Sequence, residues 1–125
     1  MYTHTTLGTD DIERARAFYD AVLGQLGAKR VKDMETASVW ASPDGGMFIA
    51  LKPTNGEPMS VGNGVTVGFA APSRKAVDDF HAAGLAAGGA DEGAPGPRGF
   101  APNAYAGYLR DPDGNKVLAL CMAEE

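Results

Sequence analysis

Apolar residues recur at helical spacing in two segments of this chain. In the first segment, Ile12, Ala15, Phe18 and Val22 share one face, and residues 73–85 repeat that pattern in the second half. Apolar positions three to four residues apart predict an amphipathic helix with one face toward the core. We therefore expect two helices, each covering one side of a sheet.

Both predicted helices begin at a polar residue. Thr9 or Asp10 would cap the first helix and Ser73 the second, because short polar side chains accept hydrogen bonds from the free amides of the first turn. Glu13 is placed to reach back to the first cap, and Gly24 should end that helix.

Shorter apolar or alternating runs predict strands around the two helices. Two Pro-Asp-Gly turns, at residues 43–45 and 112–114, each precede an apolar run. A long irregular loop is expected at residues 93–102. The predicted strands cover residues 2–8, 29–32, 36–41, 46–51, 65–71, a short stretch near 90, 104–110 and 116–122.

The same order of elements occurs twice along the chain. Residues 18–28 and 80–90 are offset by 62 positions and agree at five of eleven, while the two Pro-Asp-Gly turns are offset by 69. A repeat of this kind predicts a duplicated β-α-β-β-β module. We expect one domain over residues 1–125, with module one at 1–52, a connector at 53–64 and module two at 65–125.

Each module leaves one face of its sheet without a helix. Placed side by side, the modules predict an α+β fold, a curved, cup-shaped eight-stranded mixed sheet with the helices on the outer face. A concave face is the default place for a small ligand. The predicted function therefore centres on the inside of this cup.

Charge and composition exclude several classes of partner. The net charge is −5 and no run of Lys or Arg occurs, which argues against nucleic acid and anionic membranes. No stretch approaches the ~20 apolar residues of a membrane helix. One cysteine, Cys121, rules out an internal disulfide, and the first residues lack the layout of a secretory signal. We expect a cytoplasmic protein.

The chain resembles a known family in two stretches, HTTLGTDDIERARAFYDAVLGQLG near the start and YLRDPDGNKVLAL near the end. The family is the glyoxalase/bleomycin-resistance/extradiol-dioxygenase superfamily, also called the vicinal oxygen chelate fold. The resemblance spans essentially the whole chain and implies the cup described above. It does not single out a reaction, because the superfamily holds isomerases, epimerases, ring-cleaving dioxygenases, thiol transferases and drug-binding proteins.

The resemblance also implies where a metal would sit. Enzymes of the superfamily hold a divalent metal in the cup, with one His or Glu on the first and last strand of each module. Carried over to this chain, those positions are His4, Ile49, Thr66 and Leu118. Only His4 is a good ligand. We expect a degenerate metal site and no cofactor, unless a non-standard shell adds Glu35 or Glu57 to His4.

Several other side chains are candidates for contact with a ligand. Aromatic rings on strands can wall a cup for a planar molecule, and Arg98 could clamp a carboxylate or phosphate or remain solvated. Tyr105 and Tyr108 are three apart, so a regular strand places them on opposite faces. The turn residues Asp111, Asp113 and Asn115 should bind backbone amides. The candidate ligand-binding residues are Trp40, Phe48, Thr66, Arg98, Phe100, Tyr105 and Tyr108.

The sequence is compatible with two functions. The first is a metal-free protein that binds a small, partly aromatic molecule in the concave face. The second is a glyoxalase-type lyase or a dioxygenase with a non-standard metal shell, or with His4 as the base. The resemblance implies a homodimer in either case, and the ligand stays unidentified.

Overall fold

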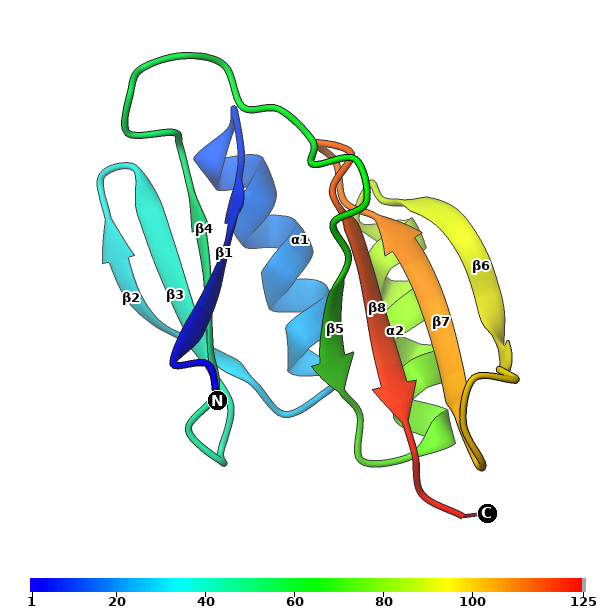
Figure 1. The fold of residues 1–125 in the computed structure, drawn as a ribbon. Coiled ribbons are helices and arrows are strands. Elements are labelled where there is room, and N and C mark those ends of the chain that lie inside the picture. Colours follow the sequence, from blue (N-terminus) through cyan, green and yellow to red (C-terminus); the bar gives the residue numbers. More distant parts are fainter. Residues whose placement is uncertain (125) are drawn as a thin grey trace.

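The computed structural model describes residues 1–124 of the chain (Figure 1). Its ten elements follow the predicted order and repeat one arrangement twice. They are β1 (His4–Gly8), α1 (Ile12–Gly24), β2 (Lys29–Met34), β3 (Ala37–Ala41), β4 (Met47–Leu51), β5 (Val67–Ala70), α2 (Arg74–Ala86), β6 (Ala90–Pro97), β7 (Tyr105–Arg110) and β8 (Lys116–Cys121). Neither helix in this part of the chain is long and apolar enough to span a membrane.

The strands form two separate four-stranded mixed sheets, in the orders β1-β4-β3-β2 and β5-β8-β7-β6. Figure 1 shows them side by side with both helices behind them. The α+β class and the two β-α-β-β-β modules are confirmed, but the single eight-stranded sheet is corrected: within residues 1–124 no strand pairing joins the two sheets. The helices pack against each other. Side chains of the two modules meet between the sheets, where the centroids of the Phe48 and Phe69 rings are 5.3 Å apart.

The internal repeat holds at the level of strand register. Thr5 pairs with Phe48 in module one, and the residues at the corresponding offsets, Val67 and Val117, pair in module two. Each helix has 13 residues, and both ends of α2 lie 62 positions after those of α1. The backbone of the two modules is therefore equivalent, and differences between them lie in the side chains.

One apolar core serves both modules. A row of ring contacts crosses it, from Trp40 to Tyr19, from Tyr19 to Phe48, then to Phe69 and to Phe80. Four of these rings are buried, with at most 4% of their surface exposed, and Phe69 is half-buried. Burial of each large aromatic side chain stabilises the fold by about 1.5–3 kcal/mol, so the shared core ties the modules together.

Three local predictions are wrong. The expected loop at residues 93–102 begins later, because β6 runs through Pro97 and is the longest strand. β6 pairs only with β7, so its outer edge tolerates proline. The cap of α1 is Asp11, whose side chain accepts a hydrogen bond from the Arg14 amide. Glu13 bonds Arg16 instead of reaching back to the cap.

Candidate functional site

The open face of module one carries His4. His4 and Ile49 lie on the side of their sheet away from α1, since Phe48, between Met47 and Ile49 on β4, faces the core. His4 is exposed, and its Nδ1 lies 2.8 Å from the Thr3 hydroxyl. An imidazole in this place can act as an acid or base toward a ligand on that face.

The open face of module two is apolar at its centre and cationic at its edge. Leu118 pairs with Gly68 and Tyr108 on this side, and Thr66 is exposed just before β5. Arg98 and Lys116 each lie over the Tyr108 ring, at 5.4 and 5.3 Å from its centroid. Such contacts hold the ring in one orientation.

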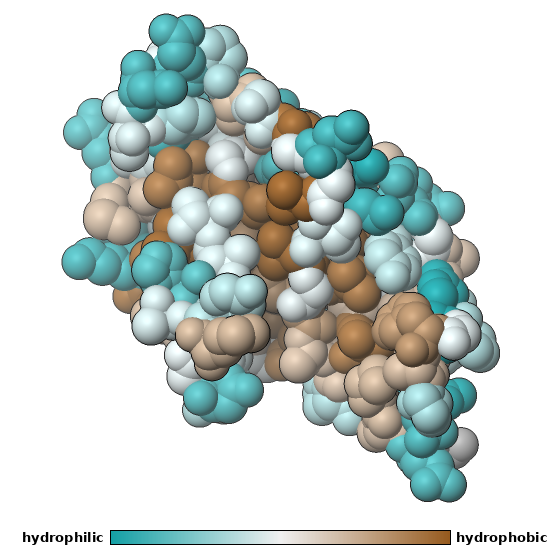
Figure 2. Space-filling model, viewed as in Figure 1, coloured by the Kyte–Doolittle hydropathy of each residue, from teal (hydrophilic) through white to brown (hydrophobic). Residues whose placement is uncertain are grey.

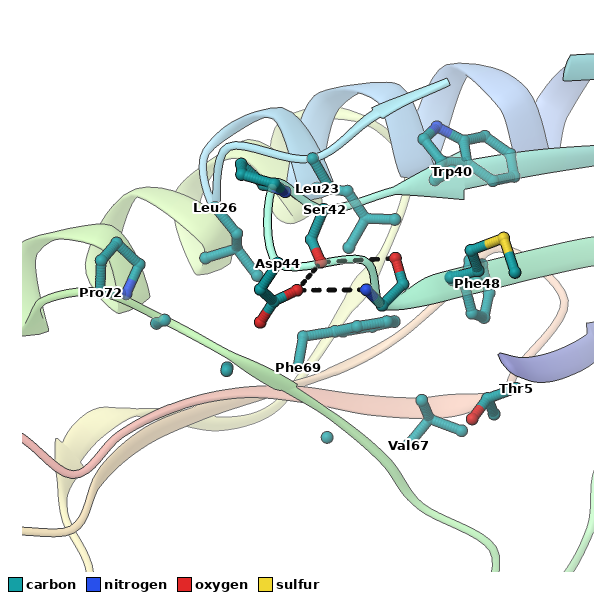
Figure 3. Close-up of a pocket in the computed structure, with 17 residues that line it drawn as sticks. Thr5, Leu23, Leu26, Trp40, Ser42, Asp44, Phe48, Val67, Phe69 and Pro72 are labelled. Carbon is teal, nitrogen blue, oxygen red and sulfur yellow. Dashed lines mark hydrogen bonds between the residues drawn. The ribbon is translucent and has the colours of Figure 1, made fainter. Parts of the chain in front are cut away.

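A cavity of about 510 Å³ lies between the two modules. Its walls come from the end of α1, from β3 and β4, from the turn between those strands, and from β5 with the segment after it (Figure 3). The apolar walls are Leu23, Leu26, Trp40, Phe48, Val67, Phe69 and Pro72, and Thr5, Ser42 and Asp44 add polar groups. The arrangement provides flat aromatic surfaces with a single carboxylate.

That carboxylate belongs to Asp44, in the turn between β3 and β4. The Ser42 hydroxyl and the Gly46 amide, the latter at 3.1 Å, both donate to its Oδ1. These two hydrogen bonds lower the pKa of Asp44 below its usual value, so the group is ionised at neutral pH. In Figure 3 no dashed line reaches the second carboxylate oxygen. It points away from the turn, toward the segment that carries Phe69 and Pro72.

The aspartate in the corresponding turn of module two binds residues of module one. Asp113 accepts hydrogen bonds from the Thr9 hydroxyl at 2.6 Å, the Asp10 amide at 3.0 Å and the Arg14 guanidinium at 2.8 Å. The Asp113 side chain is only 3% exposed. We call this group (Thr9, Asp10, Arg14 and Asp113) the inter-module staple. The sequence pattern placed Asp113 in a turn but did not predict its partners.

Next to the staple, Tyr19 joins the two modules through the core. Its hydroxyl donates to Asp111 Oδ2 at 2.5 Å, and Asp111 also accepts from the Asn115 side chain at 3.0 Å. Burial raises the pKa of Tyr19 well above its usual value, and the neighbouring Asp111 carboxylate raises it further. The expected bonds from turn amides to Asp111 are present, from Asp113 and Asn115.

Comparisons with known proteins identify the family of this chain. The model of the Glyoxalase/Bleomycin resistance protein/Dioxygenase superfamily matches residues 2–118. The chain belongs to this superfamily. A crystal structure of a glyoxalase/bleomycin resistance protein from Albidiferax ferrireducens T118 is 45% identical, with a TM-score of 0.90 over 97% of this chain and 98% of that one.

More distant structures of the superfamily share the fold alone. A glyoxalase-related enzyme from Fulvimarina pelagi is 19% identical, with a TM-score of 0.77 over 97% of this chain and 87% of that one. A lactoylglutathione lyase from Agrobacterium tumefaciens is 24% identical, with a TM-score of 0.70 over 97% and 92%. No protein of curated function matches the sequence.

The four positions that the resemblance assigned to a metal are His4, Ile49, Thr66 and Leu118. Ile49 and Leu118 offer hydrocarbon only, and Thr66 offers a neutral hydroxyl, so the set does not fit a divalent cation. Residues 1–124 contain no group of three or more His, Cys, Asp or Glu side chains placed to hold a metal. Neither Glu35 nor Glu57 therefore forms such a group with His4.

The aromatic candidates divide between the two sides of the sheets. Tyr108 lies on the open face, as expected for one member of its pair. Trp40, Phe48 and Tyr105 lie on the helix-facing side instead, and the first two line the inter-module cavity. Alternation along a strand predicts that half the rings share a face, but only the register shows which half.

The two remaining candidates lie at the end of β6. Arg98 is half-buried and donates to the Ala94 and Gly96 carbonyls, at 2.8 and 3.1 Å, so it holds β6 in place and is not a solvated loop residue. Phe100 is 61% exposed and lines neither the cavity nor the sheet core. Leu23, Leu26 and Phe69 line the cavity but were not among the candidates.

Proposed function

We propose that this member of the superfamily binds a small, partly aromatic molecule without a metal, in the cavity between its modules. The observation that carries this proposal is the cavity itself. Its volume, ≈ 510 Å³, falls within the range of about 300–1,000 Å³ that ligand pockets span, and its walls are mainly aromatic and aliphatic. The proposal moves the expected ligand from the open sheet face to this cavity, where Trp40 and Phe48 lie.

The chemistry at the superfamily's metal positions supports a binding role. The reactions of its enzymes rely on a metal that stabilises negative charge on substrate oxygens. Here one imidazole, one hydroxyl and two hydrocarbon side chains occupy those positions. A protein that only holds a molecule needs shape and apolar surface, which the cavity supplies.

The first experiment uses Trp40, the single tryptophan of the chain, as a reporter inside the cavity. A library of aromatic compounds is screened by thermal shift and by Trp40 fluorescence. A compound at 100 times its dissociation constant should stabilise the protein by about 2.7 kcal/mol. If no compound changes either signal, the proposal fails.

A pair of variants locates the bound compound. Ala71→Leu places a larger side chain in the wall of the cavity, whereas Ala82→Leu makes the same change on an exposed position of α2. We expect Ala71→Leu to weaken binding and Ala82→Leu to leave it unchanged. Equal affinity in both variants would place the compound elsewhere, for example on the open face.

The competing proposal is an enzyme, a glyoxalase-type lyase or a dioxygenase. It is favoured by His4, which lies exposed on the open face at the position of a superfamily ligand. Elemental analysis of protein purified without added metal, followed by a chelator challenge, separates the two. A stoichiometric divalent metal that is lost in His4→Gln would replace the binding proposal with this one.

We also propose that the protein is a homodimer that works in the reducing cytoplasm. Figure 2 shows hydrophobic residues gathered in the middle of the open face. Met34 and Met47 on this side are 44% and 42% exposed, and β2 and β6 are the outer edge strands. Exposed apolar patches and open edges favour association with a second copy. Sedimentation equilibrium showing only monomer at micromolar concentration would exclude the dimer.

A further inference from the structure

The inter-module cavity and the inter-module staple occupy equivalent places in the two modules. The turn of module one is closed by a bond from the Ser42 amide to the Gly46 carbonyl at 2.9 Å. The turn of module two is closed by the corresponding bond, from Asp111 to Asn115, at 2.8 Å. The two turns therefore have the same backbone. Asp113 binds the start of α1 in the other module, and Asp44 lines the cavity together with Ala71 and Pro72, just before α2 of the other module.

The helix starts also match in backbone. The Thr9 amide donates to the Leu51 carbonyl at 2.9 Å, and the Ala71 amide donates to the Leu120 carbonyl at the same distance. These pairs are related by the offsets of 62 and 69 that relate the modules. The start of each helix is therefore held alike within its own module. Ala71 and Pro72 line the cavity that Asp44 also lines, whereas Thr9 and Asp10 bind Asp113 directly.

The two helix starts differ in the donors that they offer to an aspartate. In the staple, Asp113 receives a hydroxyl, a backbone amide and a guanidinium, from Thr9, Asp10 and Arg14. All three are hydrogen-bond donors, and the last carries a positive charge. The contacts of Asp113 therefore show which groups an aspartate in this turn binds.

At the cavity, the three donors are missing. The residues 62 positions after Thr9, Asp10 and Arg14 are Ala71, Pro72 and Ala76. Alanine has no side-chain donor, and proline has no amide hydrogen. None of the ion pairs described within residues 1–124 includes Asp44. The turn and the helix start are thus separated by the cavity, with the second oxygen of Asp44 at its wall.

We propose that the cavity selects molecules that carry a guanidinium, amidinium or ammonium group on a flat apolar body, with the cation on Asp44 and the body against Trp40, Phe48 and Phe69. This inference rests on the proposed function and adds the class of ligand. The ligand would take the place that Arg14 fills in the staple. A hydrogen bond between charged partners is stronger than one between neutral groups, so charge is the expected basis of selection.

The test compares biphenyl-4-carboxamidine with its neutral analogue, biphenyl-4-carboxamide, in titrations that follow Trp40 fluorescence. The two compounds share size and shape and differ mainly in charge. We expect the amidine to bind at least about tenfold more tightly than the amide. In Asp44→Asn this preference should disappear. In the matched control Glu35→Gln, which removes an exposed carboxylate outside the cavity wall, it should remain.

The outcomes separate this inference from the proposed function. Equal binding of both compounds to the wild type, or a preference unchanged in Asp44→Asn, overturns the cation selectivity but leaves a ligand cavity. Failure of both compounds and of the whole aromatic library to alter the fluorescence overturns the cavity as a binding site. If Asp44→Asn does not fold, the affinities of the two compounds for the wild-type protein still test the selectivity, because equal affinities would overturn it.

Discussion

At the scale of single residues, two aspartates in equivalent turns have different environments. Asp113 is buried and binds three donors of the other module, whereas Asp44 is exposed and binds donors of its own turn. The two turns share a backbone, but Ser42 stands where module two has Asp111. In addition, Ala71, Pro72 and Ala76 stand where module one has the three donors. Asp44 has no counterpart of the three donors that Asp113 binds, so we expect it to bind a cationic group from outside the chain.

Tyr19 gives a prediction at this scale. Tyr19→Phe removes the hydroxyl that donates to Asp111 in the buried space between the modules. We expect the free energy of unfolding at pH 7 to fall by about 1–3 kcal/mol, because Asp111 loses one of its buried donors. Urea unfolding measures the change, and Tyr2→Phe, at an 81% exposed position, should leave stability unchanged.

The same variant predicts a pH dependence. The pKa of Tyr19 is raised in the folded state, so its contribution is complete below about pH 10, where an unfolded tyrosine titrates, and declines as pH rises above that value. The stability difference between wild type and Tyr19→Phe should therefore shrink in alkaline solution. A difference that stays constant up to pH 11 would contradict the role assigned to the phenol.

At the scale of elements, the helices follow their sequence patterns closely and β6 does not. Helix α2 begins after Ser73, as expected, because its side chain accepts the Ala76 amide at 3.0 Å. β6 contains Pro95, Pro97 and two glycines, a composition typical of a loop. It is a strand because β7 pairs with it on one side, with two register shifts that absorb the irregular residues.

The connection from α2 to β6 gives a prediction at this scale. A methyl group on Gly89 would lie 2.9 Å from the carbonyl oxygens of Gly84 and Arg110 and 2.7 Å from the Phe18 ring. Backbone atoms cannot move aside cheaply, so Gly89→Ala should lower stability by about 1–3 kcal/mol. Gly24→Ala is the matched control, since no atom lies within 4 Å of its added methyl group. Equal melting temperatures for the two variants would show that the α2–β6 connection relaxes freely.

At the scale of the whole molecule, the two modules share a core and a staple, although their sheets are not joined. The rings from Trp40 to Phe80 cross the boundary, and Asp113 binds the start of α1. Each module buries its apolar face partly against the other. Neither module therefore has a complete core of its own.

Unfolding should be a single cooperative transition for this reason. Trp40 fluorescence reports on module one, and far-ultraviolet circular dichroism reports on the strands and helices of both modules. We expect the two signals to give the same midpoint in urea. A fluorescence midpoint distinct from that of circular dichroism would show that the modules unfold separately.

By itself, the sequence determined the two helices, the repeat, the order of the strands and the superfamily, because these depend on local periodicity and on short motifs. It also predicted that His4 is the one good ligand among the four positions that the resemblance assigns to a metal, and that prediction concerns residue types alone. The tertiary structure alone decided that the sheets stay separate, that Trp40 and Phe48 face the helices, and that Asp44 lines a cavity. These features depend on strand register and on contacts between residues far apart in the chain, which no local pattern specifies.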